Sequence, residues 1–368
     1  MRRWLKYAAC LTLAVWAWLP GRAQMGNDYA GELDAILEKE SVPNREIASY
    51  TNIITIDEPC RLEGNVLIAG SGEWVRALVP YGGSADGGAA FADIANRLAD
   101  ALPRVQVYCM PIPTACEFYT PYEGEDYVRS QAEVIGRIFS KLSLKVKAVD
   151  VYSILSEHTG EDIFARTDHR WLPLGAYYAA LKFAAVAGLP FKGLETYDEK
   201  VVHRFVGSLY LYSRDGDIKA APEDFTYYIP READWNTTYV NFSLDAGRTR
   251  VVSESRPYKG RFFFNQPDGS TGAYKTFMGS DLRLACVRIP TMPNGRRLLL
   301  LKDGFGDLLP PFLFYSFEEI HIVDCRYFPG SLKAYVEQNG ITDLLLENDL
   351  FHAGMPKVIN AFNEILSR

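Results

Sequence analysis

Cysteine is scarce in this sequence, which has six among 368 residues. Five lie after the first 23 residues, and their irregular spacing matches neither a disulfide scaffold nor a zinc motif. They are interpreted as small buried hydrophobic residues that form at most one or two disulfides. We therefore predict no metal site and no cofactor. These five are Cys60, Cys109, Cys116, Cys286 and Cys325.

Positive charge is also in short supply. The chain has 39 Lys and Arg against 46 Asp and Glu, which gives a net charge of −7. Nucleic acids and anionic membrane surfaces bind proteins through clustered positive charge. We therefore expect no nucleic-acid partner.

After its N-terminus, the chain lacks an apolar run long enough to span a bilayer. A basic start is followed by the apolar segment 7–19, and Gly21 and Ala23 place small residues at positions −3 and −1 of a cleavage site. This pattern is typical of a secretory signal peptide over residues 1–23, and a retained anchor is the alternative. Cleavage would remove four basic residues and shift the net charge from −7 to −11. We expect residues 24–368 to form the exported chain.

Short apolar runs alternate with helical patterns along most of the chain. Apolar runs of this length are typical of buried strands, and the helical patterns have apolar residues every three or four positions. Their alternation predicts an α/β fold with a mostly parallel sheet flanked by helices on both faces. The predicted strands are 65–69, 105–110, 145–150, 298–302, 320–324 and 343–346, and the predicted helices are 89–102, 127–142, 174–187, 331–339 and 357–367.

Residues 203–289 interrupt this alternation. The segment is rich in Tyr, Phe, Thr and Arg and contains several glycine turn signals. We predict a β-rich insertion within a single α/β domain that spans residues 24–368. Pro173 is expected in the first turn of its helix and Gly340 at the C-terminal cap of another.

Two loops carry the candidate chemistry. Ligands of open α/β sheets bind at the carboxyl ends of the strands, so residues 302–307 should lie at that edge. Gly304 and Gly306 would allow a tight turn with exposed N–H groups that could bind an anion, although a simple strand-to-helix connection is favoured when the glycines are considered alone. In the second loop, Asp168 is placed to accept hydrogen bonds near a helix N-terminus or to pair with Arg170.

His169 lies between these two charged residues. Neighbouring side chains in an extended segment point in opposite directions, so Asp168 and His169 are not expected to form a catalytic dyad. A structural hydrogen bond is therefore favoured for His169 over a role as a base.

The residues Thr-Asp-His-Arg-Trp at 167–171, followed by Gly-Ala-Tyr-Tyr at 175–178, resemble the signature of the DHHW protein family. Segments 112–119, 205–210 and 299–307 fit the same family, so the resemblance covers most of the chain after residue 23. That family is similar to the SGNH hydrolase-like domains of alginate O-acetyltransferases, which are extracytoplasmic bacterial proteins. The resemblance implies an SGNH-hydrolase-like fold and a location in the bacterial periplasm or at the cell surface.

In those acetyltransferases a serine attacks an acyl group, a histidine acts as base and an aspartate orients the histidine. By this resemblance Asp168 retains the aspartate, whereas Arg170 replaces the histidine and Gly304 replaces the serine; Asp307 stands where the family usually has Asn. A guanidinium stays protonated and cannot act as a base, and glycine carries no nucleophile. Losing either triad member costs several orders of magnitude in rate. The resemblance therefore implies a retained fold with lost acyl-transfer chemistry.

The other candidate site residues are polar and aromatic residues of the same segments. Charged groups would make a polar cleft, and aromatic rings would stack on sugars unless they belong to the core. The predicted cleft residues are His169, Trp171, Tyr177, Lys302, Asp303, Phe305, Gly306 and Asp307, with Tyr119 as a further aromatic.

Three functions stay open at this point. In the first, the protein is a non-catalytic relative that binds a surface polysaccharide or partners a membrane-bound O-acyltransferase. In the second, it is an active polysaccharide O-acetyltransferase or acetylesterase with a relocated nucleophile, for which Ser208 and Ser280 are candidates. In the third, it is a secreted structural protein without a ligand. Arg170 and Gly304 favour the first.

Overall fold

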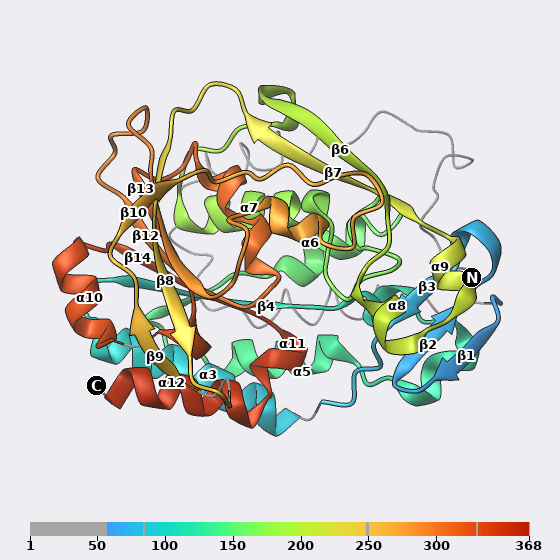
Figure 1. The fold of residues 1–368 in the computed structure, drawn as a ribbon. Coiled ribbons are helices and arrows are strands. Elements are labelled where there is room, and N and C mark those ends of the chain that lie inside the picture. Colours follow the sequence, from blue (N-terminus) through green and yellow to red (C-terminus); the bar gives the residue numbers. More distant parts are fainter. Residues whose placement is uncertain (1–56, 84, 248–249, 329, 368) are drawn as a thin grey trace, which may run out of the picture. The chain divides into compact units, whose positions relative to one another are not determined.

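The computed structural model describes residues 57–367 except 84, 248–249 and 329 (Figure 1). The predicted signal peptide lies outside these residues. Within the described part of the chain, no helix combines the length and apolar character needed to cross a membrane.

A nine-stranded mixed sheet forms the centre of the fold. Its strand order is β10-β8-β11-β13-β12-β14-β4-β5, and β9 pairs with β8 beside this path. The strands from β13 to β5 are parallel to one another, and the others pair antiparallel. The strand bounds are β4 Gln106–Ile112, β5 Val146–Ala148, β8 Asn236–Leu244, β9 Val251–Glu254, β10 Tyr258–Gly260, β11 Arg283–Arg288, β12 Arg297–Lys302, β13 Glu319–Asp324 and β14 Asp343–Asp349.

The parallel part of the sheet corresponds to five of the six strands predicted from apolar runs. Its central strands are buried on both faces, and every residue of β14 is buried. The predicted strand at 65–69 forms β2 instead in a separate antiparallel sheet, made of β1 Cys60–Glu63, β2 Val66–Ala69 and β3 Arg76–Leu78. A short apolar run has the same pattern in either sheet, so the sequence did not distinguish them.

Helices cover both faces of the main sheet (Figure 1). On one face α6 and α7 pack together, and on the other α3 packs against α5 and α12. Pro173 is the first residue of α7, and Gly340 ends α10 in the left-handed conformation, as predicted. The bounds are α3 Ala85–Ala101, α4 Ala115–Tyr119, α5 Gln131–Lys141, α6 Val151–Glu157, α7 Pro173–Ala187, α10 Leu332–Asn339, α11 Leu350–Ala353 and α12 Pro356–Ser367.

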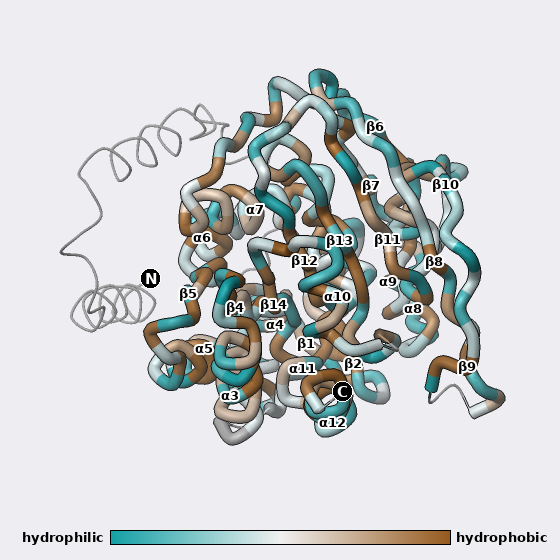
Figure 2. The backbone as a smooth tube through the Cα atoms, turned by 90° about the vertical axis from the view of Figure 1, so that its left-hand side faces the viewer, coloured by the Kyte–Doolittle hydropathy of each residue, from teal (hydrophilic) through white to brown (hydrophobic). Residues whose placement is uncertain are grey.

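The segment 203–289 is β-rich, and much of it is continuous with the main sheet. Its strands β8, β10 and β11 extend that sheet, whereas β7 Glu223–Pro230 pairs with β6 Tyr197–Phe205. The outer strand β6 is largely hydrophilic, and hydrophobic segments gather around the central strands (Figure 2).

Two short helices of this segment, α8 Ser208–Ser213 and α9 Gly216–Ala220, pack on the small sheet. They share a hydrophobic cluster with β2 and β3, to which Ile68, Leu209 and Ile218 belong. This packing places Ser208 beside the loop that precedes α7.

Candidate functional site

The loop before α7 and the loop after β12 meet at the carboxyl edge of the parallel strands. Trp171 Nε1 donates a hydrogen bond to the Phe305 carbonyl over 2.9 Å. A Cβ atom added to Gly304 would lie 3.6 Å from Arg170 Cδ. The structure therefore brings Asp168, Arg170 and Gly304 together.

Asp168 is buried and both of its carboxylate oxygens are engaged. Oδ1 accepts from Arg170 Nε at 2.9 Å, and Oδ2 accepts from the Ser208 amide at 2.8 Å. The Arg170 guanidinium also lies 3.6 Å from the centre of the Tyr274 ring. Burial opposes ionisation of Asp168, but the neighbouring Arg170 outweighs it and lowers the carboxyl pKa. Asp168 is thus held as the anion of an ion pair.

His169 contacts Asp168 too, so the expectation that these side chains point apart is wrong. The loop bends here, and His169 Nδ1 lies 3.2 Å from Asp168 Oδ1 and 3.1 Å from Ser208 Oγ. A Ser-His-Asp triad uses a different ring nitrogen for each partner. In this structure both contacts fall on Nδ1. Partial burial lowers the pKa of His169.

The two glycines of the second loop differ in their surroundings. Neither has a positive φ, so backbone conformation does not require glycine at either position. A Cβ at Gly306 would lie 2.4 Å from Glu347 Oε2 and 2.5 Å from Lys302 Cβ, whereas at Gly304 it would make an ordinary contact. Gly306 is therefore required by close packing. Gly304 leaves room for a side chain beside Arg170.

Lys302 and Asp307 point into the protein rather than into an open cleft. Lys302 is buried, and its Nζ lies 2.9 Å from Asp281 and 2.5 Å from Asp307. Burial opposes the charge on Lys302, but these two carboxylates raise its pKa. The predicted cleft role is wrong for Lys302 and Asp307, because both side chains are buried and contact each other.

Asp303 joins two residues that the sequence analysis missed. Its carboxylate accepts hydrogen bonds from the Phe305 and Asp349 amides at 2.9 and 2.7 Å. His352 Nδ1 bonds the Asp349 carboxylate and lies 3.5 Å from Asp303 Oδ2. These three side chains could hold a cation. The signal for them was Glu-Asn-Asp directly after the apolar part of β14, at the same sheet edge.

Two groups of this cluster, Asp303 and His352, have raised pKa values. Burial and the nearby Asp349 raise the pKa of Asp303 to about 8. Burial opposes the charge on His352, but its hydrogen bond to Asp349 outweighs burial and raises the His352 pKa to about 9.

These shifts predict a loss of stability in mild alkali. Between pH 3.8 and 8 the folded state keeps a proton on Asp303 that the unfolded state loses, and for His352 the window is pH 6.5 to 9. Unfolding free energy therefore falls as pH rises, on the order of 5 kcal/mol between pH 6.5 and 9. Calorimetric unfolding at several pH values between 6.5 and 9 measures this change in the free energy of unfolding. The double variant Asp303→Asn, His352→Gln should show a flatter profile, and an unchanged slope would contradict the assignment.

The predicted aromatic cleft residues belong to the core. Trp171 is 0% exposed, Tyr177 and Phe305 are 1% exposed, and Tyr119 is 3% exposed. Tyr177, which belongs to α7, packs on Phe312. The prediction of a sugar-stacking surface is therefore wrong for these residues, because the gain from burying large rings places them inside. Asp303 is buried as well.

The surface that stays accessible at this edge is polar. It includes five partly exposed residues, and the side chain of His169 is 37% exposed. These residues are His169, Arg170, Ser208, Gly304 and His352.

All five cysteines after residue 23 are free. Cys109, Cys116 and Cys325 are buried, as interpreted from the sequence, whereas Cys60 and Cys286 are partly exposed.

Comparisons with known proteins agree with this architecture. A family model described as DHHW protein matches residues 77–323. The crystal structure of a DHHW family protein from Eubacterium siraeum is 35% identical and superposes with a TM-score of 0.73, covering 84% of this chain and 97% of that one. No curated protein sequence matches.

Two more distant structures are similar. Bacillus cereus PatB1, also solved with a sulfonyl adduct, is 16% identical with a TM-score of 0.58, covering 82% of this chain and 99% of that one. The O-acetyltransferase domain of Pseudomonas putida AlgJ is 13% identical with a TM-score of 0.39, covering 84% of this chain and all of that one. The PatB1 similarity agrees with the predicted α/β fold, in which a mostly parallel sheet is flanked by helices.

Proposed function

Because this chain belongs to the DHHW protein family, we propose that it is a catalytically degenerate member that acts by binding. Its ligand is a polysaccharide of the bacterial cell envelope, and its partner is a membrane-bound O-acyltransferase. It is exported and works in the periplasm or at the cell surface. The DHHW signature at residues 167–171 resembles the corresponding segment of alginate O-acetyltransferases, which supports a role in polysaccharide modification.

The contact between Arg170 and Asp168 carries this proposal. In a triad the aspartate holds a histidine ready to receive a proton from the serine. Here the aspartate is bound by a guanidinium, which stays protonated, and the guanidinium faces Gly304. The base and the nucleophile are thus both absent from a scaffold that still has space for them.

A rearranged enzyme is the second candidate, and one contact favours it. Ser208 Oγ lies 3.1 Å from His169 Nδ1, which could accept its proton. The same nitrogen also faces Asp168, so the aspartate cannot orient the ring from the opposite side. Ser280 has a simpler role, since its Oγ accepts a hydrogen bond from the Leu282 amide.

A sulfonyl fluoride separates the two candidates, because it labels activated serines. PatB1 has been solved with a sulfonyl adduct, which makes this reagent a suitable probe of the fold. We expect no adduct on the unmodified protein by intact mass. The double variant Arg170→His, Gly304→Ser should be labelled at position 304, because Gly304 has room for a Cβ atom.

The single variants serve as controls. The double variant should hydrolyse an acetyl ester at least about 100-fold faster than Gly304→Ser alone, which lacks the base. Labelling of Ser208 in the unmodified protein, located by peptide mapping, would overturn the degenerate assignment and support the rearranged enzyme.

Binding is tested with acetylated and deacetylated envelope polysaccharides by calorimetry. His169→Ala should weaken binding, because the His169 side chain is 37% exposed at the site and its removal creates no large cavity. Leu144→Ala, which alters a side chain that is 96% exposed and belongs to neither loop, is the matched control and should bind normally. Equal binding by both variants would show that this edge is not the binding surface.

A further inference from the structure

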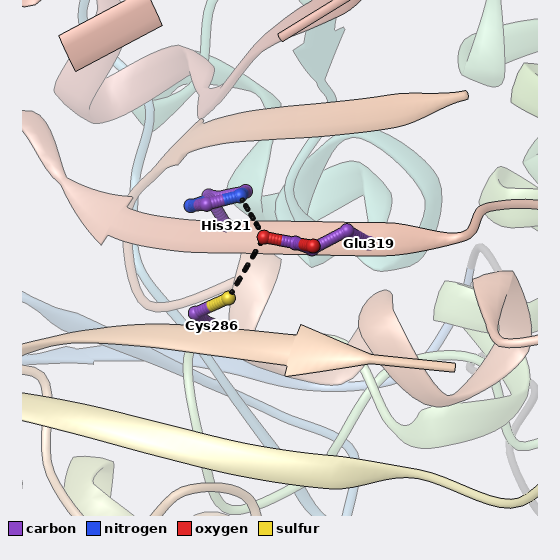
Figure 3. A group of neighbouring side chains, drawn as sticks. All are labelled: Cys286, Glu319 and His321. Atoms are coloured by element: carbon purple, nitrogen blue, oxygen red, sulfur yellow. Dashed lines mark hydrogen bonds and ion pairs between the residues drawn. The ribbon is translucent and has the colours of Figure 1, made fainter. Parts of the chain in front are cut away.

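A second polar cluster lies on the main sheet, where β11 and β13 pair. Cys286 stands directly opposite His321 in this antiparallel pair, and Glu319 precedes His321 by two residues on β13. Residues two apart on a strand share a face, so the three side chains project from the same side of the sheet. Figure 3 shows them converging on one point between the strands.

The spacing of the donor atoms suits a small metal ion. Cys286 Sγ and His321 Nε2 lie 3.3 and 2.9 Å from Glu319 Oε1, and all three donor atoms lie within 4.8 Å of one another. A tetrahedral zinc ion bound at about 2.3 Å from sulfur and about 2.0–2.2 Å from nitrogen and oxygen separates its ligand atoms by roughly 3.3–3.6 Å. Small side-chain rotations would bring the donors to those separations.

Tyr335 orients the ring of His321 through the ring nitrogen that does not face Glu319. Tyr335 on α10 contacts His321 Nδ1 at 2.6 Å, so Nε2 is directed toward Glu319. His321 is 1% exposed, and its Nε2 makes no hydrogen bond of acceptable geometry despite its closeness to the carboxylate. Metal-binding histidines characteristically have such a partner on the other ring nitrogen. A cation between Nε2 and the carboxylate would satisfy both.

We propose that Cys286, Glu319 and His321 bind a divalent cation of borderline softness, best represented by Zn²⁺. The thiol proton passes to solvent, and the thiolate, one carboxylate oxygen and Nε2 bind the metal. The imidazole proton then lies on Nδ1 and is donated to the Tyr335 oxygen. Cys286 and Glu319 are partly exposed, so the ion enters from solvent and a water molecule completes the tetrahedron.

The charges of the cluster are compatible with this ion. Two anionic ligands neutralise a divalent cation, so the site is neutral overall when filled. The positively charged Arg288 lies 3.9 Å from the second oxygen of Glu319 and is not repelled by a filled site without net charge. That oxygen can retain its arginine partner while the first oxygen binds the metal.

A reactive cysteine is the competing interpretation of this cluster. Burial, assisted by the Glu319 charge, raises the pKa of Cys286 to about 12. Without a cation the group is therefore a protonated thiol, which is a poor nucleophile and reacts slowly with oxidants. The geometry of the three donor atoms, rather than the reactivity of the thiol, therefore carries the assignment of a metal site.

Cobalt(II) is the spectroscopic probe for this site. The purified protein, stripped with a chelator, should develop on Co²⁺ addition a thiolate-to-cobalt charge-transfer absorption that saturates at one Co²⁺ per chain and that Zn²⁺ removes by displacement. Cys286→Ser should abolish this absorption. Glu319→Gln should weaken Zn²⁺ binding by more than about 100-fold, and Tyr335→Phe by about 10–100-fold, as for partners that orient a ligand.

Two variants provide matched controls. Cys60→Ser alters the other partly exposed free cysteine and should keep the absorption. His352→Gln removes a ligand of the separate Asp303 cluster and should also keep it. Circular dichroism verifies folding of each variant. Absence of the absorption from the unmodified protein, or its persistence in Cys286→Ser, overturns the proposal.

Discussion

Asp168→Ala is expected to lower the free energy of unfolding by about 3–5 kcal/mol, because it leaves a buried charge without its partner. Arg170 would keep its guanidinium against the Tyr274 ring with no carboxylate beside it. The Ser208 amide would also lose its acceptor. Urea denaturation measures the change.

Two further variants sharpen this test. Asp168→Ala combined with Arg170→Met should be more stable than Asp168→Ala alone, because no unpaired buried charge remains. Asp93→Ala removes an exposed aspartate from an ion pair with Arg97 and should cost no more than about 1 kcal/mol. A loss below about 1 kcal/mol for Asp168→Ala would show that Arg170 finds another partner or reaches water.

Trp171→Ala should destabilise the protein by about 3–5 kcal/mol, the usual cost of truncating a fully buried aromatic residue. The Trp171 side chain packs on the Phe305 ring, with centroids 5.5 Å apart, and its indole N–H bonds the Phe305 carbonyl. The substitution would leave a cavity between the two loops of the site. Calorimetric unfolding measures the effect.

Trp74 provides the comparison for this prediction. Its side chain is 47% exposed, and Trp74→Ala should change stability by no more than about 0.5 kcal/mol. Similar losses for both variants would contradict the burial of Trp171. Because Trp171→Ala opens the core, a loss of glycan binding in that variant would report unfolding rather than a contact with sugar.

The parallel half of the sheet could be predicted from sequence, since β4, β5, β12, β13 and β14 are apolar runs separated by helical patterns. A strand that is buried on both faces has a nearly continuous run of apolar residues, so it can be recognised in the sequence. The antiparallel half could not be predicted in detail. Strands β8 and β11 mix polar and apolar residues, and their register depends on partners far away in the chain.

The candidate site shows the same division. The pairing of Asp168 with Arg170 was predictable because the residues are two apart in one loop. Tyr274 and Asp349 were missed, since only the fold brings them to this edge. Residue type also does not reveal exposure, which is why Trp171 and Phe305 were placed in a cleft.

The metal-binding cluster illustrates this limit further. Cys286 and Glu319 are separated by 33 positions, and only the pairing of two antiparallel strands makes them neighbours. Motif spacing along the chain therefore gave no indication of the site.

The two edge strands that end the order of the main sheet affect how this protein can associate with other chains. Its order ends at β10 and β5, which are three residues long and have a central lysine, Lys259 and Lys147. Short edge strands with a charged side chain are poor templates for an added strand. Self-association by strand addition is thereby disfavoured at these ends. A partner that docks at β10 or β5 should therefore be selected by side-chain surfaces rather than by backbone pairing.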